Sequence, residues 1–574
     1  MPVIRVEEVE SVPCAGGRRF GVTGAAGPAT LRRLRVHHAV DPHAPANAAI
    51  VDLDLAERDA DGRVRFDHDV VIVQLDDVTA RNGWAMVDVP NRGGPTISAF
   101  LQADDTAFYP QPEQPPIGDG HLLAAGWTLV FAGWQFDIAQ PSLLGLRAPV
   151  ARAGGAELSG PVRYTFRAGS GSSRLPLVLP GHRLWPPEPD SAVLYQDDVA
   201  QPPDSWRFDV DRASLERPGG FEAGAWYRCE YSTTGALVGG CGLLALRDVV
   251  PWLRATEGVS RTILFGISQS GRVIRQFLHD GLNVDEAGVA AYDAVMPVIA
   301  GGRRGQFNRR FAVPGALPFG AEGTDVDPTY GTLLARAGAP LKVMAMNSAS
   351  EYWRGDAAGL WPEDHPDVRV HHVAGTQHTA GYLPQLFELK ALGWKGRHGF
   401  NTIDYRPVLR ALLEQVVAWV EHGVPPTPST APDPAQLSTR DAVLARFAGA
   451  GVATPREASF VQPAGPVAAV DELGNELGGI RLPDVAAPVG VHTGWNVRHP
   501  DMGAEHDELF LVGSSWWLDE LADLDTHRAR TAAVVAGLVE RRLLLEADVP
   551  AVLARAELAW HTAAAAIAAR PPAG

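Results

Sequence analysis

The chain has 574 residues, enough for two to four domains, and its 46% of apolar and 20% of charged residues are typical of a globular protein. The formal net charge of −17 disfavours a nucleic-acid partner and a polybasic membrane contact. The start has no apolar secretion signal and no apolar run reaches the length of a membrane span, so we expect a cytoplasmic protein. The three cysteines form no Cys/His cluster and predict neither a disulfide framework nor a metal site.

Two stretches of the chain, residues 1–82 and 141–235, are predicted to be rich in β-structure. In the first, residues 49–55 and 64–75 alternate between apolar and polar side chains and are separated by turn residues. Each stretch is too small to bury a comfortable core alone. We therefore predict that the N-terminal segment, 1–82, and the second stretch, 141–235, which would be an insertion in the catalytic domain, pack together as an accessory layer.

Residues 83–140 and 236–425 show a different pattern, in which short apolar runs alternate with amphipathic helical patterns. Apolar runs of this kind are typical of buried parallel strands, and the alternation favours a mostly parallel sheet with helices on both faces. A proline-rich linker at 425–434 precedes a C-terminal region, 435–574, which ends in two helical patterns with apolar faces. The sequence thus predicts an α/β fold with a discontinuous catalytic domain.

Ser268 lies between an apolar strand pattern and an amphipathic helix pattern. A nucleophile elbow requires this context, with small residues two places before and two places after the serine. Gly266 and Ser270 occupy those places, whereas Ser270 as nucleophile would have the long side chain of Arg272 there. The alternative is that Ser268 only caps the helix, but no Glu or Gln three residues later completes a capping box. We predict Ser268 as the nucleophile.

The base and the acid of a serine triad follow the nucleophile along the chain in this type of sheet. Glu351 comes four residues after one apolar strand pattern, and His378 lies in the loop after the next. Histidine would take the serine proton, and a carboxylate would orient the imidazole. We therefore predict Glu351 as the acid and His378 as the base. Asp356, Asp364 and Asp367 lie in the same connection and remain alternative acids.

An oxyanion hole requires backbone N–H groups directed at the developing negative charge. We predict the N–H of Gln269, directly after the nucleophile, as one donor. The glycine-rich turn after an earlier strand pattern, with Asn91 and Arg92, is predicted to supply the other, although it could be an ordinary turn. Trp134 and Gln135, after the following strand pattern, are candidates for the pocket wall.

The segment 301–311 holds an unusual concentration of arginines, among them Arg303 and Arg304. Guanidinium groups would suit a substrate carboxylate, but the interpretation that we favour is that these arginines pair with structural acids. The acids considered as partners are Asp285, Glu286 and Asp293. Trp495, in a Gly-Trp-Asn turn, is a further pocket candidate, although tryptophans in a chain of this size are usually part of the core.

Several motifs stand in one order along the chain: VPNRGG, GWTLVFAGWQFD, GISQSGRVIRQFLHDGLNVDEAG, AGGRRGQFNRRFAVPG, NSASEYWRGDAAGL, VAGTQH, GNELGGIRLPD and HTGWNVRHPDMG. Together they resemble the large bacterial "α/β-hydrolase domain-containing" proteins with a SQSGR elbow, over nearly the whole chain. The elbow alone is also similar to the turn of tannase-like and glucuronoyl esterases. The family resemblance implies an α/β-hydrolase fold and a serine hydrolase with esterase-like activity. It marks Ser268 as nucleophile, His378 as base and Glu351 as acid.

These observations predict a metal-independent serine hydrolase that cleaves carboxylic esters through an acyl-enzyme and needs no cofactor. One alternative is an acyltransferase that uses the same triad with an alcohol or amine acceptor. Another is a non-catalytic protein that binds a glycan or a partner on a hydrolase scaffold, although a complete triad in the right order argues against it. The expected partner is a small-molecule ester, and the sequence leaves the oligomeric state open.

Overall fold

The computed structural model divides the chain into two compact units. The described residues are 2–21, 24–101, 117–168, 172–315, 326, 328–354, 357, 364–390, 393–432, 434–459 and 465–569. The first unit comprises Met1–Val298 and Arg303–Val343, and the second comprises Ile299–Gly302 and Met344–Gly574. Across the described part of the chain, every helix is too short or too polar to span a bilayer.

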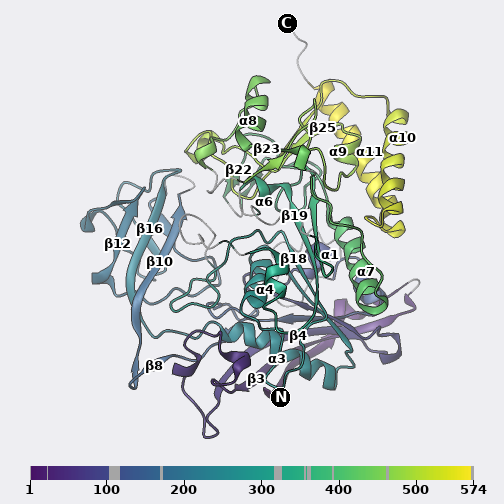
Figure 1. Cartoon of the computed structure of the whole chain (residues 1–574). Helices are drawn as coiled ribbons and strands as arrows, with labels where there is room; N and C mark the ends of the chain where they lie inside the picture. Colours follow the sequence, from purple (N-terminus) through teal and green to yellow (C-terminus); the bar gives the residue numbers. More distant parts are fainter. Residues whose placement is uncertain are drawn as a thin grey trace. The chain divides into compact units, whose positions relative to one another are not determined.

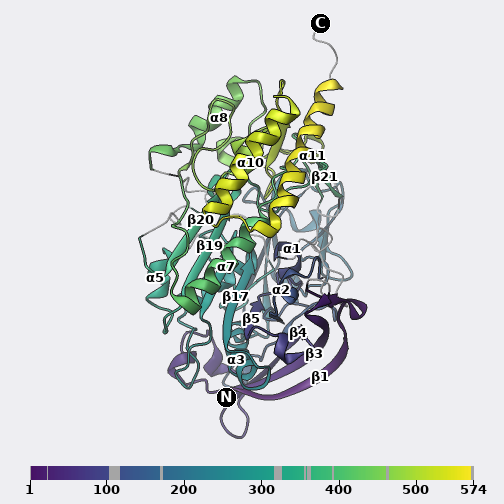
Figure 2. The same cartoon turned by 90° about the vertical axis from the view of Figure 1, so that its right-hand side faces the viewer.

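The first unit is built on a mixed sheet (Figures 1 and 2). Its strand order is β1 (Val3–Pro13), β3 (Gly27–Val40), β4 (Val64–Leu75), β6 (Thr128–Ala132), β5 (Trp84–Asp88), β17 (Arg261–Ile267) and β18 (Ala294–Val298). The short strands β2 (Arg19–Phe20) and β7 (Leu146–Arg147) pair with β3 and β4. The strands pair antiparallel from β1 as far as β6, and β6, β5, β17 and β18 pair parallel.

The burial of the strands follows this change of direction. Every residue of β17 after Arg261 is buried, as expected for a parallel strand covered on both faces. In β4, by contrast, buried and accessible residues alternate as far as Asp69, and all residues from Val70 onward are buried. One face of the antiparallel part is therefore accessible to solvent, while the parallel part forms the core.

The N-terminal strands differ from the expected accessory layer, because β1, β3 and β4 extend the main sheet. Segment 49–55 is also not a strand: it forms turns and a short 3-10 helix, Leu53–Leu55, preceded by Asp52 in a left-handed conformation. Its apolar side chains Ile50 and Leu53 are buried from this turn. Alternation over a few residues therefore indicated burial correctly but not the strand geometry.

The helices of the first unit cover this sheet. They are α1 (Ile97–Leu101), α2 (His121–Ala124), α3 (Cys241–Thr256), α4 (Gln269–His279) and α5 (Tyr330–Leu334). Helix α3 contacts β1, β3 and β4, whereas α4 packs on β17 and β18. The segment predicted as a strand, turn and helix around Ser268 is thus β17 followed directly by α4.

Apart from β7, which belongs to the main sheet, the strands within residues 141–235 form small antiparallel sheets of their own, visible in blue in Figure 1. One has the order β10 (Ser159–Arg167), β16 (Trp226–Thr234), β12 (Val193–Gln196) and β13 (Val199–Ala200). Another has the order β11 (Arg174–Pro176), β15 (Ser214–Glu216) and β14 (Arg207–Phe208), and β8 (Arg152–Ala153) pairs with β9 (Ala156–Glu157). The predicted insertion is therefore rich in β-structure and lies within the first unit.

The longer segment of the second unit begins within β19 (Lys342–Ser348), and β20 (Val368–Val373) is a neighbour of β19 in the sheet. Its helices are α6 (Ala349–Trp353), α7 (Arg406–His422), α8 (Arg440–Gly449), α9 (Pro483–Ala486), α10 (Leu524–Glu540) and α11 (Val549–Ala568). Its strand pairs are β21 (Glu388–Leu389) with β22 (Trp394–Lys395), β23 (Leu437–Ser438) with β24 (Val467–Ala468), and β25 (Gly490–Thr493) with β26 (Ser514–Trp517).

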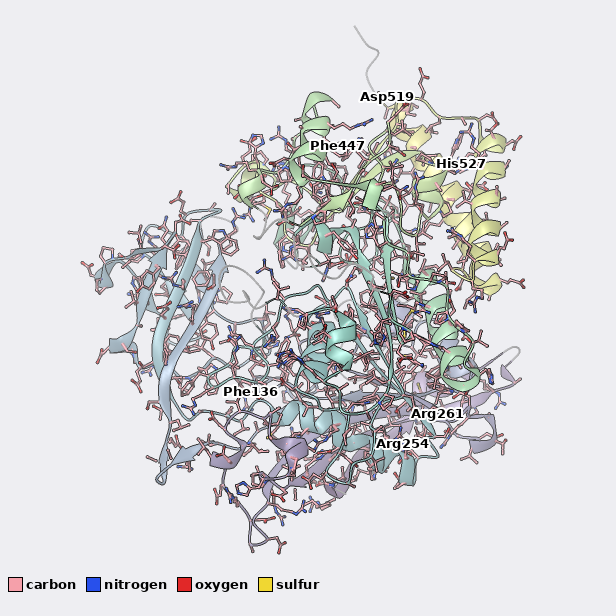
Figure 3. All side chains as sticks on the ribbon, in the orientation of Figure 1. Phe136, Arg254, Arg261, Phe447, Asp519 and His527 are labelled. Atoms are coloured by element: carbon pink, nitrogen blue, oxygen red, sulfur yellow. The ribbon has the colours of Figure 1, made fainter. Side chains whose placement is uncertain are left out.

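The two final helices were predicted from the sequence, and α10 and α11 lie side by side in Figures 1 and 2. Helix α11 begins at Val549 with a proline in its first turn, where the missing N–H group costs nothing. The region after the proline-rich linker belongs to the same compact unit as β20. One of its hydrophobic clusters contains Phe447, labelled in Figure 3, together with Trp353 of α6.

Candidate active site

Ser268 occupies a sharp turn between β17 and α4. Its φ of 58° and ψ of −114° are unusual for a residue with a side chain, and such strained serines mark nucleophile elbows. The Ser268 side chain does not cap α4, which removes the alternative of a simple helix cap. A Cβ atom on Gly266 would lie 2.6 Å from the Ser270 carbonyl oxygen. The strand and helix backbones therefore approach each other as closely as the elbow pattern predicts.

Ser270, the rival nucleophile, is fully buried. Its hydroxyl group lies 2.9 Å from both the carbonyl oxygen and the backbone nitrogen of Ile267. These hydrogen bonds hold the hydroxyl inside the turn. The local structure therefore favours Ser268 over Ser270.

The close approach at Gly266 leads to a first prediction. Gly266→Ala should destabilise the first unit by ~1–3 kcal/mol, because its new methyl group would overlap backbone atoms of Ser270 that cannot rotate away. Denaturant unfolding measures this change. Gly537→Ala is the matched control: no heavy atom lies within 4 Å of its new methyl group, so it should be neutral or stabilising. Equal effects of the two substitutions would contradict the prediction.

The predicted oxyanion loop contacts the elbow. The Asn91 side-chain amide donates to the Ile267 carbonyl at 2.8 Å, and the Arg92 N–H donates to the Gln269 side-chain oxygen at 3.0 Å. The Asn91 N–H in turn donates to the Gly94 carbonyl at 2.8 Å. Both backbone donors proposed in this loop are thus engaged within the protein, so the structure does not favour them as oxyanion donors. The Gln269 N–H, at the first position of α4, belongs to the turn that lacks intrahelical acceptors.

The Gly-Trp-Gln turn after β6 also lies beside the elbow. The fully buried Gln135 accepts a hydrogen bond of 3.2 Å from the Gln269 side chain and donates one of 2.6 Å to Asp137. Trp134 is 2% exposed, and its indole N–H donates to the Pro90 carbonyl at 2.8 Å. These two pocket candidates therefore support the elbow from within the protein, a role that their sequence pattern did not indicate.

Asp88, at the end of β5, anchors the far end of the loop that contains Asn91 and Arg92. Its carboxylate accepts hydrogen bonds of 2.5 Å from both the N–H and the hydroxyl of Thr96, and a longer one from the N–H of Ile97. Burial raises the pKa of Asp88 from 3.8 to about 7, against the lowering effect of these hydrogen bonds. The sequence showed only an apolar strand end here and gave no signal for this anchor.

The raised pKa of Asp88 gives a pH-dependent prediction. The folded protein binds the proton of Asp88 more tightly than the unfolded chain does. The contribution of this proton to the free energy of unfolding is therefore complete below pH ~4 and is lost as the pH rises through about 7. In the Asp88→Asn variant, the neutral amide would imitate the protonated carboxyl group at every pH. Unfolding measured from pH ~4 to ~8 should therefore show this variant gaining stability relative to the wild type, by up to about 4 kcal/mol. If the difference in free energy of unfolding between Asp88→Asn and the wild type stays constant with pH, the raised pKa of Asp88 is refuted.

Glu351 and His378 lie together in the second unit. His378 Nδ1 is 2.5 Å from one carboxylate oxygen of Glu351, and both side chains are buried. The other carboxylate oxygen accepts hydrogen bonds from the N–H and the hydroxyl of Ser348, at 2.6 and 2.7 Å, in a capping box at the start of α6. The carboxylate is therefore fixed by the helix start while it orients the imidazole. Of the alternative acids, Asp364 is exposed and Asp356 lies outside the described residues.

The arginines of the segment 301–311 lie in the first unit, which includes Arg303–Val343. Arg303 is 4% exposed and Arg304 is half-buried, while Arg310 pairs with Asp52 at 2.6 Å. The three acids considered as their partners bind other groups: Asp293 contacts Arg254 and Arg261, Glu286 contacts Arg63, and Asp285 closes its own turn. Arg310 thus pairs with a structural acid, as that interpretation expects, but the acid is Asp52 and not one of the three that the sequence suggested.

Trp495 has no exposed surface and packs in a hydrophobic cluster of the second unit. Its ring meets those of Trp353 and Phe447 edge-on, with centroids 6.0 and 5.3 Å apart. Such aromatic contacts stabilise a core. The structure therefore places Trp495 in the core and not at a surface that a substrate could reach.

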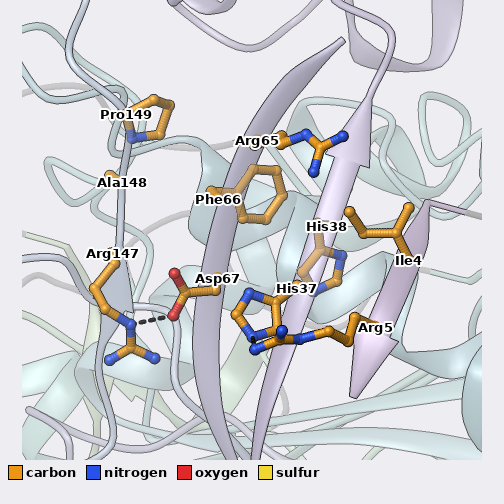
Figure 4. Close-up of a pocket in the computed structure, with 10 residues that line it drawn as sticks. All are labelled: Ile4, Arg5, His37, His38, Arg65, Phe66, Asp67, Arg147, Ala148 and Pro149. Atoms are coloured by element: carbon orange, nitrogen blue, oxygen red, sulfur yellow. Dashed lines mark hydrogen bonds and ion pairs between the residues drawn. The ribbon is translucent and has the colours of Figure 1, made fainter. Parts of the chain in front are cut away.

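A pocket of about 400 Å³ lies elsewhere in the first unit, beside β1, β3, β4 and β7 (Figure 4). Its cationic side chains are already paired, Arg5 with Glu7, Arg65 with Asp59 and Arg147 with Asp67. None of the residues predicted for catalysis lines it. We therefore assign this pocket no part in the candidate active site.

A family model described as "Alpha/beta hydrolase domain" matches residues 242–554, more than half of the chain. The chain belongs to this family. The fold of this α/β-hydrolase agrees with the one implied by the sequence resemblance. A search of curated proteins finds no match.

Solved structures similar to this α/β-hydrolase include three esterases at low identity. A glucuronoyl esterase from Solibacter usitatus has 11% identity and a TM-score of 0.28, over 65% of this chain and 81% of that one. A glucuronoyl esterase from Teredinibacter turnerae has 11% identity and a TM-score of 0.25, over 62% and 66%. The rice cell wall degrading esterase LipA from Xanthomonas oryzae has 10% identity and a TM-score of 0.18, over 52% and 50%.

Proposed function

We propose that this α/β-hydrolase is a serine esterase that cleaves carboxylic esters through an acyl-enzyme. The observation that carries the proposal is the 2.5 Å contact between His378 Nδ1 and Glu351. A carboxylate at Nδ1 holds the proton there, which leaves Nε2 as the basic nitrogen that a serine hydroxyl requires. The strained turn at Ser268 supports the same chemistry, because the Ser268 side chain makes no capping hydrogen bond to α4.

In the proposed reaction, the Ser268 hydroxyl attacks the ester carbonyl while His378 accepts its proton. The Gln269 N–H stabilises the negative oxygen of the tetrahedral intermediate. His378 then protonates the departing alcohol, and the acyl group remains on Ser268. A water molecule, deprotonated by His378, releases the acid and restores the enzyme. Every step uses groups of the chain and water, so we propose that the reaction is independent of metal ions.

Labelling with a fluorophosphonate, followed by an ester panel, tests the proposal. The probe should form a covalent adduct on Ser268, mapped by peptide mass spectrometry, and addition of a chelator should not change hydrolysis of the panel. The panel varies the acyl and the alcohol part separately. Absence of both labelling and hydrolysis would favour the non-catalytic scaffold. Faster acyl transfer to an added alcohol or amine than to water would favour the acyltransferase.

A further inference from the structure

The loop that carries His378 is fixed by hydrogen bonds at the peptide of Gly375. The Gly375 N–H donates to Glu476 at 2.8 Å, and its carbonyl accepts from the Asn401 side chain at 2.6 Å. Gly375 has a φ of 66°, a conformation that a residue with a side chain adopts only with strain. This peptide therefore sets the direction in which the loop leaves β20 toward His378.

The Glu476 carboxylate contacts both elements that hold the predicted acid and base. One oxygen accepts the Gly375 N–H and lies 3.0 Å from His372 Nε2, on β20. The other accepts the indole N–H of Trp353, on α6, at 3.2 Å. Helix α6 carries Glu351, and the loop after β20 carries His378. A single carboxylate thus links the two segments whose separation decides the acid–base contact.

The burial of Glu476 indicates that these links matter. The residue is 2% exposed, and within the described residues no arginine or lysine pairs with it. A buried carboxyl group is costly unless it is hydrogen-bonded, and the N–H groups of Gly375 and Trp353 supply such bonds. Gly479 lets the segment that carries Glu476 approach β20 closely, since a Cβ atom on Gly479 would lie 2.6 Å from the His372 ring. The Gly-Asn-Glu-Leu-Gly-Gly motif is therefore built around this carboxylate.

We propose that Glu476 is a positioning residue for the acid–base pair, an inference that rests on the proposed esterase function for its kinetic consequences. It acts through the Gly375 peptide and the Trp353 indole and does not contact the reacting atoms. A second set of hydrogen bonds joins the same two segments: the Ala349 and Ser350 N–H groups both donate to Thr376 at 3.2 Å. Glu476 completes this connection from the C-terminal region.

Glu476→Gln tests the inference, because glutamine keeps the size but places an NH₂ group where one of the donors needs an oxygen. We expect kcat to fall by ~10-fold or more with KM changed less than about two-fold, since a displaced base impairs the chemical step and not binding. Val443→Ala is the matched control: it removes buried methyl groups from the hydrophobic cluster that also contains Trp353, but it removes none of the hydrogen bonds to Glu476. It should lower the unfolding midpoint and leave kcat unchanged.

Two outcomes would overturn the inference: an unchanged kcat in folded Glu476→Gln, or an equal loss of kcat in Val443→Ala. If Glu476→Gln does not fold, Trp353→Phe removes the indole N–H donor together with part of the buried ring. Its kcat should then fall more than that of Val443→Ala, which alters the packing of the same cluster but keeps the donor. Solvent exchange of the His378 Nδ1 proton, measured in ¹⁵N-histidine-labelled protein, provides a readout that needs no turnover. It should be faster in Glu476→Gln and unchanged in Val443→Ala. If the wild type hydrolyses no ester, the proposed function fails, and this exchange rate still decides the role of Glu476.

Discussion

Ser268→Ala is expected to lower the rate of ester hydrolysis by ~10³-fold or more, because alanine leaves no nucleophile to form the acyl-enzyme. The fold should be retained. The Ser268 side chain does not cap α4, and alanine is no larger than serine in the tight turn. Initial rates on the ester panel, together with denaturant unfolding of the same preparation, measure both properties.

Ser270→Ala is the matched control for this experiment. Its hydroxyl is buried and bonded to Ile267, so its loss should reduce stability by about 1 kcal/mol and leave most of the activity. Fluorophosphonate labelling should likewise disappear in Ser268→Ala and persist in Ser270→Ala. Activity that survives in Ser268→Ala and is lost in Ser270→Ala would reverse the assignment of the nucleophile.

Glu351→Gln should reduce kcat by roughly 10²- to 10⁴-fold without unfolding the second unit. An amide cannot stabilise the imidazolium, and it can donate to Nδ1, which would move the proton of His378 to Nε2 and remove the base. Glutamine still suits the capping box with Ser348, so α6 should form as before. Steady-state kinetics and thermal unfolding separate the two effects.

Asp364→Asn serves as the control for that substitution, since Asp364 lies in the same connection but is exposed. It should leave kcat and the unfolding temperature within experimental error. A loss of activity in Asp364→Asn comparable to that in Glu351→Gln would mean that the acid has been misassigned. A Glu351→Gln variant that retains full activity would mean the same.

The elements nearest to the candidate nucleophile could be predicted because their signals are local. The apolar run and the helical pattern around Ser268 correspond to β17 and α4, and the steric need for Gly266 follows from the backbone alone. The order of strands in the sheet, by contrast, could not be predicted from local signals. Whether β3 and β4 join the main sheet or form a layer of their own depends on contacts between distant segments, which alternation within one strand does not encode.

Side-chain hydrogen bonds explain the remaining differences between the site predicted from the sequence and the site in the structure. The loop holding Arg92 was predicted beside the elbow, yet the Gln269 side chain takes up the Arg92 N–H. That contact follows from one rotamer in a packed interior and leaves no trace in residue spacing. Glu476 is a similar case: its motif stood out in the sequence, but its partners Trp353 and Gly375 lie more than 100 residues away along the chain.

The division of the chain within β19 restricts how this protein could be rearranged by recombination. Val343 belongs to the first unit and Met344 to the second, so the boundary falls between two buried residues of one strand. Gene segments exchanged at this point would interrupt a strand and not a loop, and each product would expose apolar edges. The half with the elbow would lack His378, and the other half would lack Ser268. Shuffling of whole units is thus an unfavourable route to new family members, whereas insertions such as 141–235 alter the protein without dividing β19.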